Sequence, residues 1–236
     1  MYKPFELKTP FFEFGPKAYL YGAELLKLVQ AMDASAVKYD IDVIVDPQTL
    51  DIRLLAENTR RVRIFGQHMD AIPVGRGMGA ILPEALKAAG ATGVLLNHAE
   101  RKLSMEEIAR TIRRADEVGL ATMVCADTIA EMRAVAECAP NIIVAEPTEL
   151  IGTGKASPMA YVLESIAIVK AVNPEIQVLQ GAGISNGRDV YNVIKAGADA
   201  TGSSSGIAKA ADPAAMADEM IAAVRRAWDE RQKEKE

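Results

Sequence analysis

The 236-residue chain contains few cysteine and histidine residues, which argues against a disulfide-stabilised or metal-binding protein. It has two cysteines, Cys125 and Cys138, which are too few for a disulfide scaffold. It also has two histidines, His68 and His98, and these four side chains lack the spacing of a metal site. We therefore expect a reduced, cytoplasmic protein that binds no metal.

Long apolar segments and basic runs are also missing. No apolar stretch approaches the roughly 20 residues that span a bilayer, and the first residues lack the apolar core of a signal peptide. The formal net charge is −5 and no long basic run is present, so neither membrane nor nucleic-acid binding is expected. The whole sequence is 50% hydrophobic and 25% charged, a composition typical of a globular domain with a substantial core.

Short apolar runs alternate with longer amphipathic stretches. The apolar runs predict strands at residues 11–15, 41–46, 62–66, 92–96, 120–125, 141–145, 176–180 and 199–202. The other stretches predict helices near residues 20–38, 48–58, 80–89, 104–117, 128–138, 157–172, 187–196 and 213–231. This alternation predicts an α/β fold, a single (β/α)8 barrel domain over residues 1–236. The alternative, an open doubly wound sheet, lacks a Gly-x-Gly-x-x-Gly motif after the first strand. The charged tail at about 229–236 is expected to fray.

In such a barrel the carboxyl ends of the strands form the active face. Lys17 follows the first predicted strand, His98 the fourth and Glu146 the sixth. Loops of small residues follow the seventh and eighth strands, at 181–184 and 203–206. Backbone N–H groups in such loops can converge on a phosphate, although tight turns between strands and helices also use small residues. We therefore expect a phosphorylated small molecule at this face.

The sixth strand and its loop form the most distinctive stretch of the sequence. A buried strand delivers Glu146 to its end, Pro147 stiffens the exit, and Gly152 and Gly154 allow unusual backbone geometry. This arrangement is typical of a hinged lid over a catalytic base. The alternative is an ordinary strand-to-helix loop that carries a surface acid.

A carboxylate, an imidazole and an ammonium around one small space suit proton transfer next to a carbonyl group. Glu146 would take the proton, His98 would donate a hydrogen bond to the substrate oxygens, and Lys17 would stabilise their negative charge. No cofactor is needed for this chemistry. Singly, Lys17 could be a solvated loop lysine and His98 a structural histidine. We assign a structural role to His68.

Three motifs resemble those of triosephosphate isomerases, above all the short archaeal type. They are Asn97-His98-Ala99-Glu100-Arg101, the segment Glu-Pro-Thr-Glu-Leu-Ile-Gly-Thr-Gly-Lys at 146–155, and Gly-Ala-Gly-Ile at 181–184. The resemblance runs from about Phe11 to Pro213. It implies the TIM barrel fold and a cofactor-free isomerase of glycolysis and gluconeogenesis that interconverts D-glyceraldehyde 3-phosphate and dihydroxyacetone phosphate. It also implies a homo-oligomer, either a tetramer or a dimer.

The resemblance further implies roles for single residues. The catalytic residues are the base Glu146, the neutral electrophile His98, the electrostatic partner Lys17 and a second acid beside it, Glu100. The backbone N–H groups that hold the phosphate belong to Gly152, Gly183, Ser204 and Ser205. The residues of the closing lid are Pro147, Ile151, Thr153 and Gly154.

Three positions depart from the family pattern. Gly15 stands where the family has asparagine, Met78 where it has threonine, and Ala99 where it has serine. Because Gly15 and Ala99 make room and remove polar groups, a longer phosphorylated sugar such as a tetrose phosphate is an alternative substrate. The changes at Gly15 and Met78 leave open a phosphosugar-binding barrel that has lost catalysis. A different barrel chemistry, an aldolase that forms a Schiff base on Lys17, is a further alternative.

Overall fold

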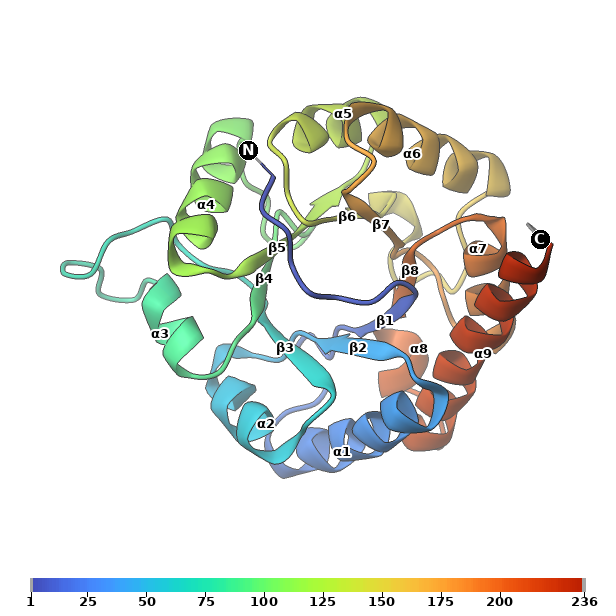
Figure 1. Cartoon of the computed structure of the whole chain (residues 1–236). Helices are drawn as coiled ribbons and strands as arrows, with labels where there is room; N and C mark the ends of the chain where they lie inside the picture. Colours follow the sequence, from blue (N-terminus) through green and yellow to red (C-terminus); the bar gives the residue numbers. More distant parts are fainter. Residues whose placement is uncertain (1, 235–236) are drawn as a thin grey trace.

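The computed structural model of the protein describes residues 2–234. Its parallel strands pair in chain order and close into a barrel, with β1 beside β8, and helices surround the barrel (Figure 1). The strands are β1 (Phe11–Phe14), β2 (Asp42–Val45), β3 (Val62–Gly66), β4 (Gly93–Leu96), β5 (Ala121–Ala126), β6 (Ile142–Ala145), β7 (Gln177–Gln180) and β8 (Ala200–Ser203). The predicted TIM barrel is confirmed.

The helices follow the strands almost as the sequence predicts. They are α1 (Gly22–Tyr39), η1 (Thr49–Asp51), α2 (Ile52–Asn58), α3 (Pro83–Ala88), α4 (Met105–Val118), α5 (Ile129–Glu137), η2 (Thr148–Leu150), α6 (Met159–Val172), α7 (Gly187–Ala196), α8 (Ser205–Ala208) and α9 (Pro213–Lys233). The sequence does not predict the short helices η2 and α8, and the helix expected at 48–58 begins as the 3-10 turn η1. Among the described residues, none of the helices has the length and apolar character needed to cross a membrane.

Alternation along the strands builds two cores. Phe11 on β1 and Ile44 on β2 point into the barrel, where they pack with inward residues of the other strands. Their neighbours Phe12 and Val43 point outward and pack in the core beneath the helices. Near the carboxyl ends of the strands, two inward positions carry acids instead, Glu13 on β1 and Asp46 directly after β2.

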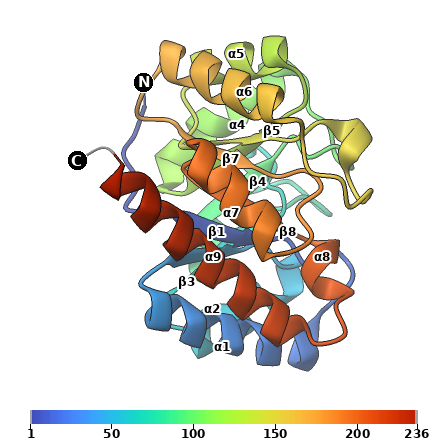
Figure 2. The same ribbon diagram turned by 90° about the vertical axis from the view of Figure 1, so that its right-hand side faces the viewer.

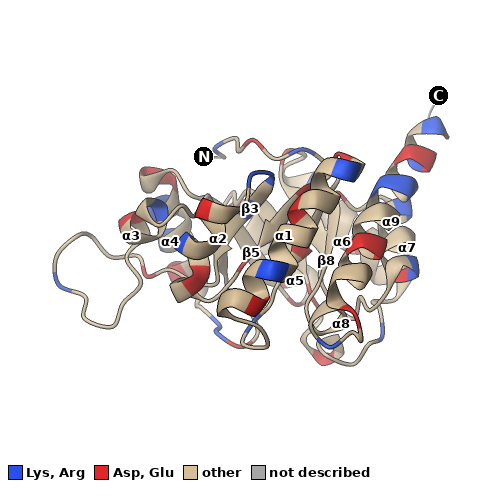
Figure 3. Ribbon diagram, turned by 90° about the horizontal axis from the view of Figure 1, so that it is seen from below, with Lys and Arg blue, Asp and Glu red and all other residues tan. Residues whose placement is uncertain are grey.

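The loops at that end contain the two unpredicted helices. In Figure 2, η2 and α8 lie on the side opposite the two chain termini. A loop of residues 71–80 between β3 and α3 projects from the barrel (Figures 1 and 3). Its one charged residue is Arg76, and Met78 near its tip is fully exposed.

The last helix is longer than expected. The sequence predicts a frayed tail from about residue 229, but α9 continues to Lys233. The reason is Arg231, which is buried and donates hydrogen bonds to the Ile194 and Ala198 carbonyls at 2.7 and 2.9 Å. A buried arginine with two acceptors fixes the helix against the barrel. Residues 235–236 of the expected tail lie outside the described residues.

Candidate active site

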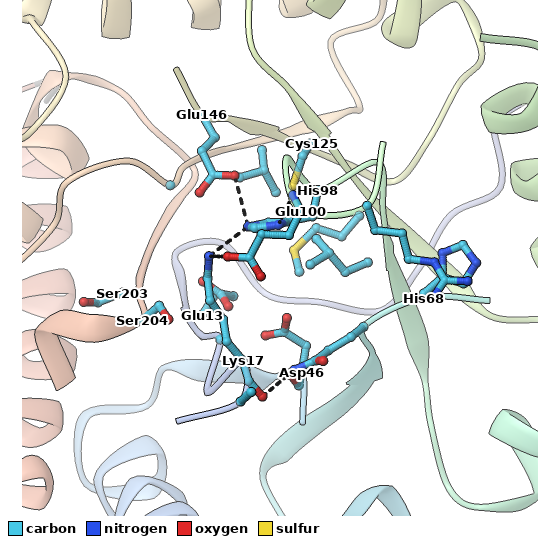
Figure 4. Close-up of a pocket in the computed structure, with 18 of the residues that line it drawn as sticks. Glu13, Lys17, Asp46, His68, His98, Glu100, Cys125, Glu146, Ser203 and Ser204 are labelled. Carbon is cyan, nitrogen blue, oxygen red and sulfur yellow. Dashed lines mark hydrogen bonds and ion pairs between the residues drawn. The ribbon is translucent and has the colours of Figure 1, made fainter. Parts of the chain in front are cut away.

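A cavity of about 310 Å³ opens at the carboxyl ends of the strands. All four predicted catalytic side chains line it: Lys17, His98, Glu100 and Glu146. Figure 4 shows them pointing toward one another from the three loops that follow β1, β4 and β6. The barrel therefore brings together residues that are up to 129 positions apart in the sequence, the separation of Lys17 and Glu146.

Lys17 is held by its backbone as well as by its side chain. Its φ angle is +48°, a conformation that residues other than glycine rarely adopt. The Gln67 side chain at the end of β3 donates hydrogen bonds to the carbonyls of Lys17 and Asp46, at 3.1 and 2.9 Å. Gln67 thereby ties together the loops after β1 and β2, which fixes the start of the lysine side chain.

The Lys17 ammonium lies between a carboxylate and an imidazole. Its Nζ donates a hydrogen bond to Glu100 Oε1 at 2.7 Å and lies 3.2 Å from His98 Nε2. The hydrogen bond from Lys17 lowers the pKa of Glu100. Glu100 therefore stays ionised and anchors the ammonium at the cavity wall, beside the imidazole.

The loop after β4 sets the tautomer of His98. The backbone N–H of Glu100 donates to His98 Nδ1 at 3.1 Å, so Nδ1 is the acceptor and Nε2 carries the proton. Burial, followed by the charge of Lys17, lowers the pKa of His98. A neutral imidazole thus presents its Nε2–H group to the cavity. Nε2 lies 3.6 Å from Glu146 Oε2.

Glu146 stands directly after β6, where its N–H donates to the Ala126 carbonyl at 3.0 Å. Its side chain is only 11% exposed. Burial raises its pKa to about 7, although the charge of Lys17 and a hydrogen bond from the Cys125 thiol oppose the rise. The pKa of Cys125 is itself well above its usual range because of burial, so the thiol keeps its proton and can donate it. A carboxylate with a pKa near neutrality is suited to accept and return a proton.

The loops after β7 and β8 are joined at the cavity edge. Ser203 Oγ donates to the Ile184 carbonyl at 2.8 Å. Of the residues expected to hold a phosphate, Ser204 lines the cavity, together with Gly181 and Ser203, and its hydroxyl is buried without a hydrogen-bond partner in the described structure.

The other three residues expected at the phosphate, Gly152, Gly183 and Ser205, lie outside the cavity lining. Ser205 begins α8, whereas Gly183 packs against the end of the lid. A Cβ atom at position 183 would lie 1.8 Å from the Lys155 carbonyl oxygen, and the φ of Gly183 is +72°. Only glycine permits this contact between the lid and the β7 loop.

The expected lid forms a compact turn at the surface. Its start is held by the Thr148 N–H, which donates to Asp127 Oδ1 at 3.1 Å. Within it, Thr153 Oγ1 donates to the Leu150 carbonyl at 2.8 Å. Pro147 is buried and Ile151 is half-buried, whereas Gly152, Thr153 and Gly154 are exposed. The segment therefore has a fixed root and an exposed tip.

Sequence reasoning missed several residues of the cavity. Glu13, Asp46, Gln67 and Cys125 line it without having been predicted, and His68, for which we expected a structural role, also lines it and lies 3.3 Å from Asp70 Oδ1. A signal existed for two of them. Glu13 interrupts the run Phe-Phe-Glu-Phe, and Asp46 ends the run Val-Ile-Val-Asp, so both acids fall on inward positions of buried strands.

Together these groups form a site for proton transfer. A buried carboxylate faces a neutral N–H donor, and an ammonium lies beside that donor, 3.2 Å from it. A small carbonyl compound bound in the cavity against these groups would meet one base and two hydrogen-bond donors.

Comparison with known proteins gives a consistent answer. The family model described as triosephosphate isomerase matches residues 15–224. Triosephosphate isomerase from Methanobacterium bryantii is 37% identical over 87% of this chain and 93% of its own length. The enzyme from Sulfolobus acidocaldarius is 33% identical over 95% of this chain and 99% of its own length. The crystal structure of triosephosphate isomerase from Bartonella henselae superimposes with a TM-score of 0.77, at 16% identity, over 93% of this chain and 100% of that one.

Proposed function

The chain belongs to the triosephosphate isomerase family, and we propose that Glu146, His98 and Lys17 interconvert D-glyceraldehyde 3-phosphate and dihydroxyacetone phosphate in the cavity described above. The observation that carries this proposal is the juxtaposition of the three groups. The His98 Nε2 atom lies 3.6 Å from the Glu146 carboxylate and 3.2 Å from the Lys17 ammonium. The reaction is a step of glycolysis and gluconeogenesis.

The reaction moves one proton between adjacent carbon atoms. The Glu146 carboxylate takes the proton from C2 of the aldose, which leaves an enediolate. The Nε2–H group of His98 donates to the two substrate oxygens in turn, and the Lys17 ammonium stabilises their negative charge. Glu146 then returns the proton to C1, and the hydroxyl proton of O2 ends on O1, which gives the ketose. Glu100 keeps Lys17 in place.

The phosphate group and the lid belong to the same proposal. Ser204 supports a phosphate position at the β7–β8 edge because it faces the cavity from the loop after β8. Closure of the lid would bring the backbone N–H of Gly152 to the phosphate, joining those of Gly183, Ser204 and Ser205. Gly183 lies close to the Lys155 carbonyl. Through this contact, movement of the lid would shift the loop after β7, which carries part of the phosphate site.

A steady-state assay tests the assignment of the base. Glu146→Gln keeps the shape of the side chain but cannot accept a proton, so kcat/KM for D-glyceraldehyde 3-phosphate should fall by about 10³-fold or more. The matched control is Glu164→Gln on the exposed face of α6, which should keep full activity. Full activity in Glu146→Gln would refute the assignment. Binding of triose phosphate without turnover by the unmodified protein would instead support a phosphosugar-binding barrel.

We also propose a homo-oligomer in the cytoplasm, where triose phosphates are metabolised. The projecting loop of residues 71–80 supports an assembly because Val74 is 71% exposed and Met78 fully exposed. Exposed apolar side chains grouped on one projecting loop are typical of a contact between proteins. Light scattering after gel filtration should show a dimer or a tetramer, and Met78→Lys should shift the protein toward a smaller species. A monomer in the unmodified protein would contradict this proposal.

A further inference from the structure

Two carboxyl groups of the cavity have no part in the mechanism above. Glu13 on β1 and Asp46 directly after β2 both point into the cavity, on the side of Lys17 (Figure 4). The two strands are neighbours in the barrel, so the two side chains adjoin one another. Asp46 is buried, and the exposed part of Glu13 faces the cavity.

The structure provides space for this acid pair through two glycines. A Cβ atom at Gly202 on β8 would lie 2.0 Å from Glu13 Oε2, so a side chain there would displace the glutamate. A Cβ atom at Gly15 would lie 3.0 Å from Glu13 Oε1 and 3.5 Å from Asp46 Oδ1. The missing side chain at position 15 therefore leaves both carboxyl groups open to the cavity from above.

One proton shared by the two carboxyl groups would relieve two unfavourable features of this pair. Asp46 Oδ1 is buried and receives no hydrogen bond from the N–H and O–H groups of the described structure. Two adjoining carboxylates repel one another, and burial penalises both charges. A proton on Glu13 removes one charge and supplies the missing donor to Asp46. Burial followed by the charge of Asp46 raises the pKa of Glu13 well above its usual range, and the Asp46 pKa rises to about 6.

The pair also lies deeper than the reacting groups. Glu146 lines the cavity at the end of β6, and so does Val144, the preceding inward residue. The cavity thus extends down by about two residues of strand, roughly 6–7 Å below the level of Glu146. Apolar side chains form the rest of this lower part, among them Leu95 and Met123. There is room below the reacting groups for further carbon atoms, with polar partners on one wall only.

We propose that Glu13 and Asp46 form a hydroxyl-binding subsite that lets this isomerase accept sugar monophosphates with four carbon atoms. The shared proton lies between Glu13 and Asp46, so the pair presents carboxyl oxygens to which a ligand hydroxyl group can donate a hydrogen bond. The remaining negative charge would repel a second phosphate or a carboxylate at this end of the ligand. The ligand is therefore a sugar that carries one phosphate and, at the end that enters this subsite, only uncharged hydroxyl groups. The inference rests on the proposed function, because it assigns Glu146 as the base for both substrates.

The test compares two substrates in the same protein. Isomerisation of D-erythrulose 4-phosphate between its C2 and C3 atoms leaves the C1 hydroxymethyl group on the side of the reacting carbons away from the phosphate, and it is followed by NMR. Isomerisation of D-glyceraldehyde 3-phosphate is followed by a coupled assay. The unmodified protein should convert D-erythrulose 4-phosphate. In Glu13→Met and in Asp46→Asn, the ratio of kcat/KM for that substrate to kcat/KM for the triose phosphate should fall at least about tenfold, because a buried partner of the hydroxyl is lost.

A buried carboxyl at the other end of the barrel provides the control. Asp42 begins β2 and pairs with Arg61, with a distance of 2.8 Å between Arg61 Nε and Asp42 Oδ1; Asp42→Asn should leave the ratio unchanged. A ratio unchanged within twofold in both variants of the pair would overturn the subsite. Should either variant fail to fold, turnover of D-erythrulose 4-phosphate by the unmodified protein decides: triose phosphate turnover without turnover of D-erythrulose 4-phosphate overturns the subsite alone. If the unmodified protein converted neither substrate, the proposed function would be overturned as well.

Discussion

Ionisation of Glu146 should lower the free energy of unfolding, and a glutamine at this position should restore it. The pKa of Glu146 is raised from 4.5 to about 7, chiefly by burial. A group whose pKa is raised by folding stabilises the folded state at low pH, and this contribution is lost as the pH rises through about 7. One pKa unit corresponds to about 1.4 kcal/mol. Compared with a side chain that does not ionise, Glu146 therefore lowers the free energy of unfolding by about 3 kcal/mol at pH 8. At pH 5, where this carboxyl group is largely ionised only in the unfolded chain, the loss is about 1 kcal/mol.

Glu146→Gln removes this ionisation while it keeps the size of the side chain. Urea unfolding should show a gain of about 3 kcal/mol at pH 8 and about 1 kcal/mol at pH 5. For a chain of this length, the melting temperature should rise by about 6–12 °C at pH 8. The control is Glu164→Gln on α6, where the carboxylate is exposed. This variant should have the same free energy of unfolding as the unmodified protein at pH 5 and at pH 8.

The pH dependence of the gain is what separates this account from a general packing effect. If Glu146→Gln were stabilised equally at pH 5 and pH 8, the gain would not come from the cost of ionising a buried carboxyl group. A variant that is less stable than the unmodified protein at pH 8 would refute the reasoning, since it would mean that the charged form of Glu146 is favoured by its surroundings.

Three more perturbations have definite expected outcomes. In a pH profile, kcat/KM for triose phosphate should fall about tenfold per pH unit below about 7, because protonated Glu146 cannot accept a proton; a flat profile down to pH 5 would contradict this. Gly183→Ala should raise KM for triose phosphate about tenfold or more in a protein with an unchanged circular dichroism spectrum, because its Cβ would lie 1.8 Å from the Lys155 carbonyl oxygen; an unchanged KM would argue against this lid contact. Arg231→Met should cost about 2–3 kcal/mol in urea unfolding, because two carbonyl partners are lost; the exposed Lys233→Met should cost less than about 0.5 kcal/mol, and equal losses would show that burial of Arg231 does not matter.

The strands of the barrel could be predicted from the sequence because apolar runs of strand length leave little ambiguity. Each predicted strand lies within one residue of its observed ends. The helix η2 could not be predicted in the same way, because a single turn has no periodicity to detect. The length of α9 was missed for a different reason: Arg231 looks like a surface residue in a charged tail, and only the fold shows the two carbonyls that bury it.

The placement of Lys17, His98, Glu100 and Glu146 in one cavity could be predicted because each lies in a loop that follows a predicted strand. Their contacts could not. The donation from the Glu100 N–H to His98 Nδ1 and the two hydrogen bonds of Gln67 depend on loop conformations that no spacing in the sequence encodes. Glu13 was missed because alternation along an apolar run does not show which of its two faces points into a closed barrel.

Proton transfer by Glu146 is the central claim, and the isomerisation of D-glyceraldehyde 3-phosphate in D₂O tests it most directly. A carboxylate that holds the proton between its removal from C2 and its delivery to C1 can exchange it with solvent. Proton NMR should therefore show deuterium at C1 of the dihydroxyacetone phosphate formed, and Glu146→Gln should abolish both product and label. Product that forms at the normal rate without deuterium, or with Glu146 replaced, would contradict the account.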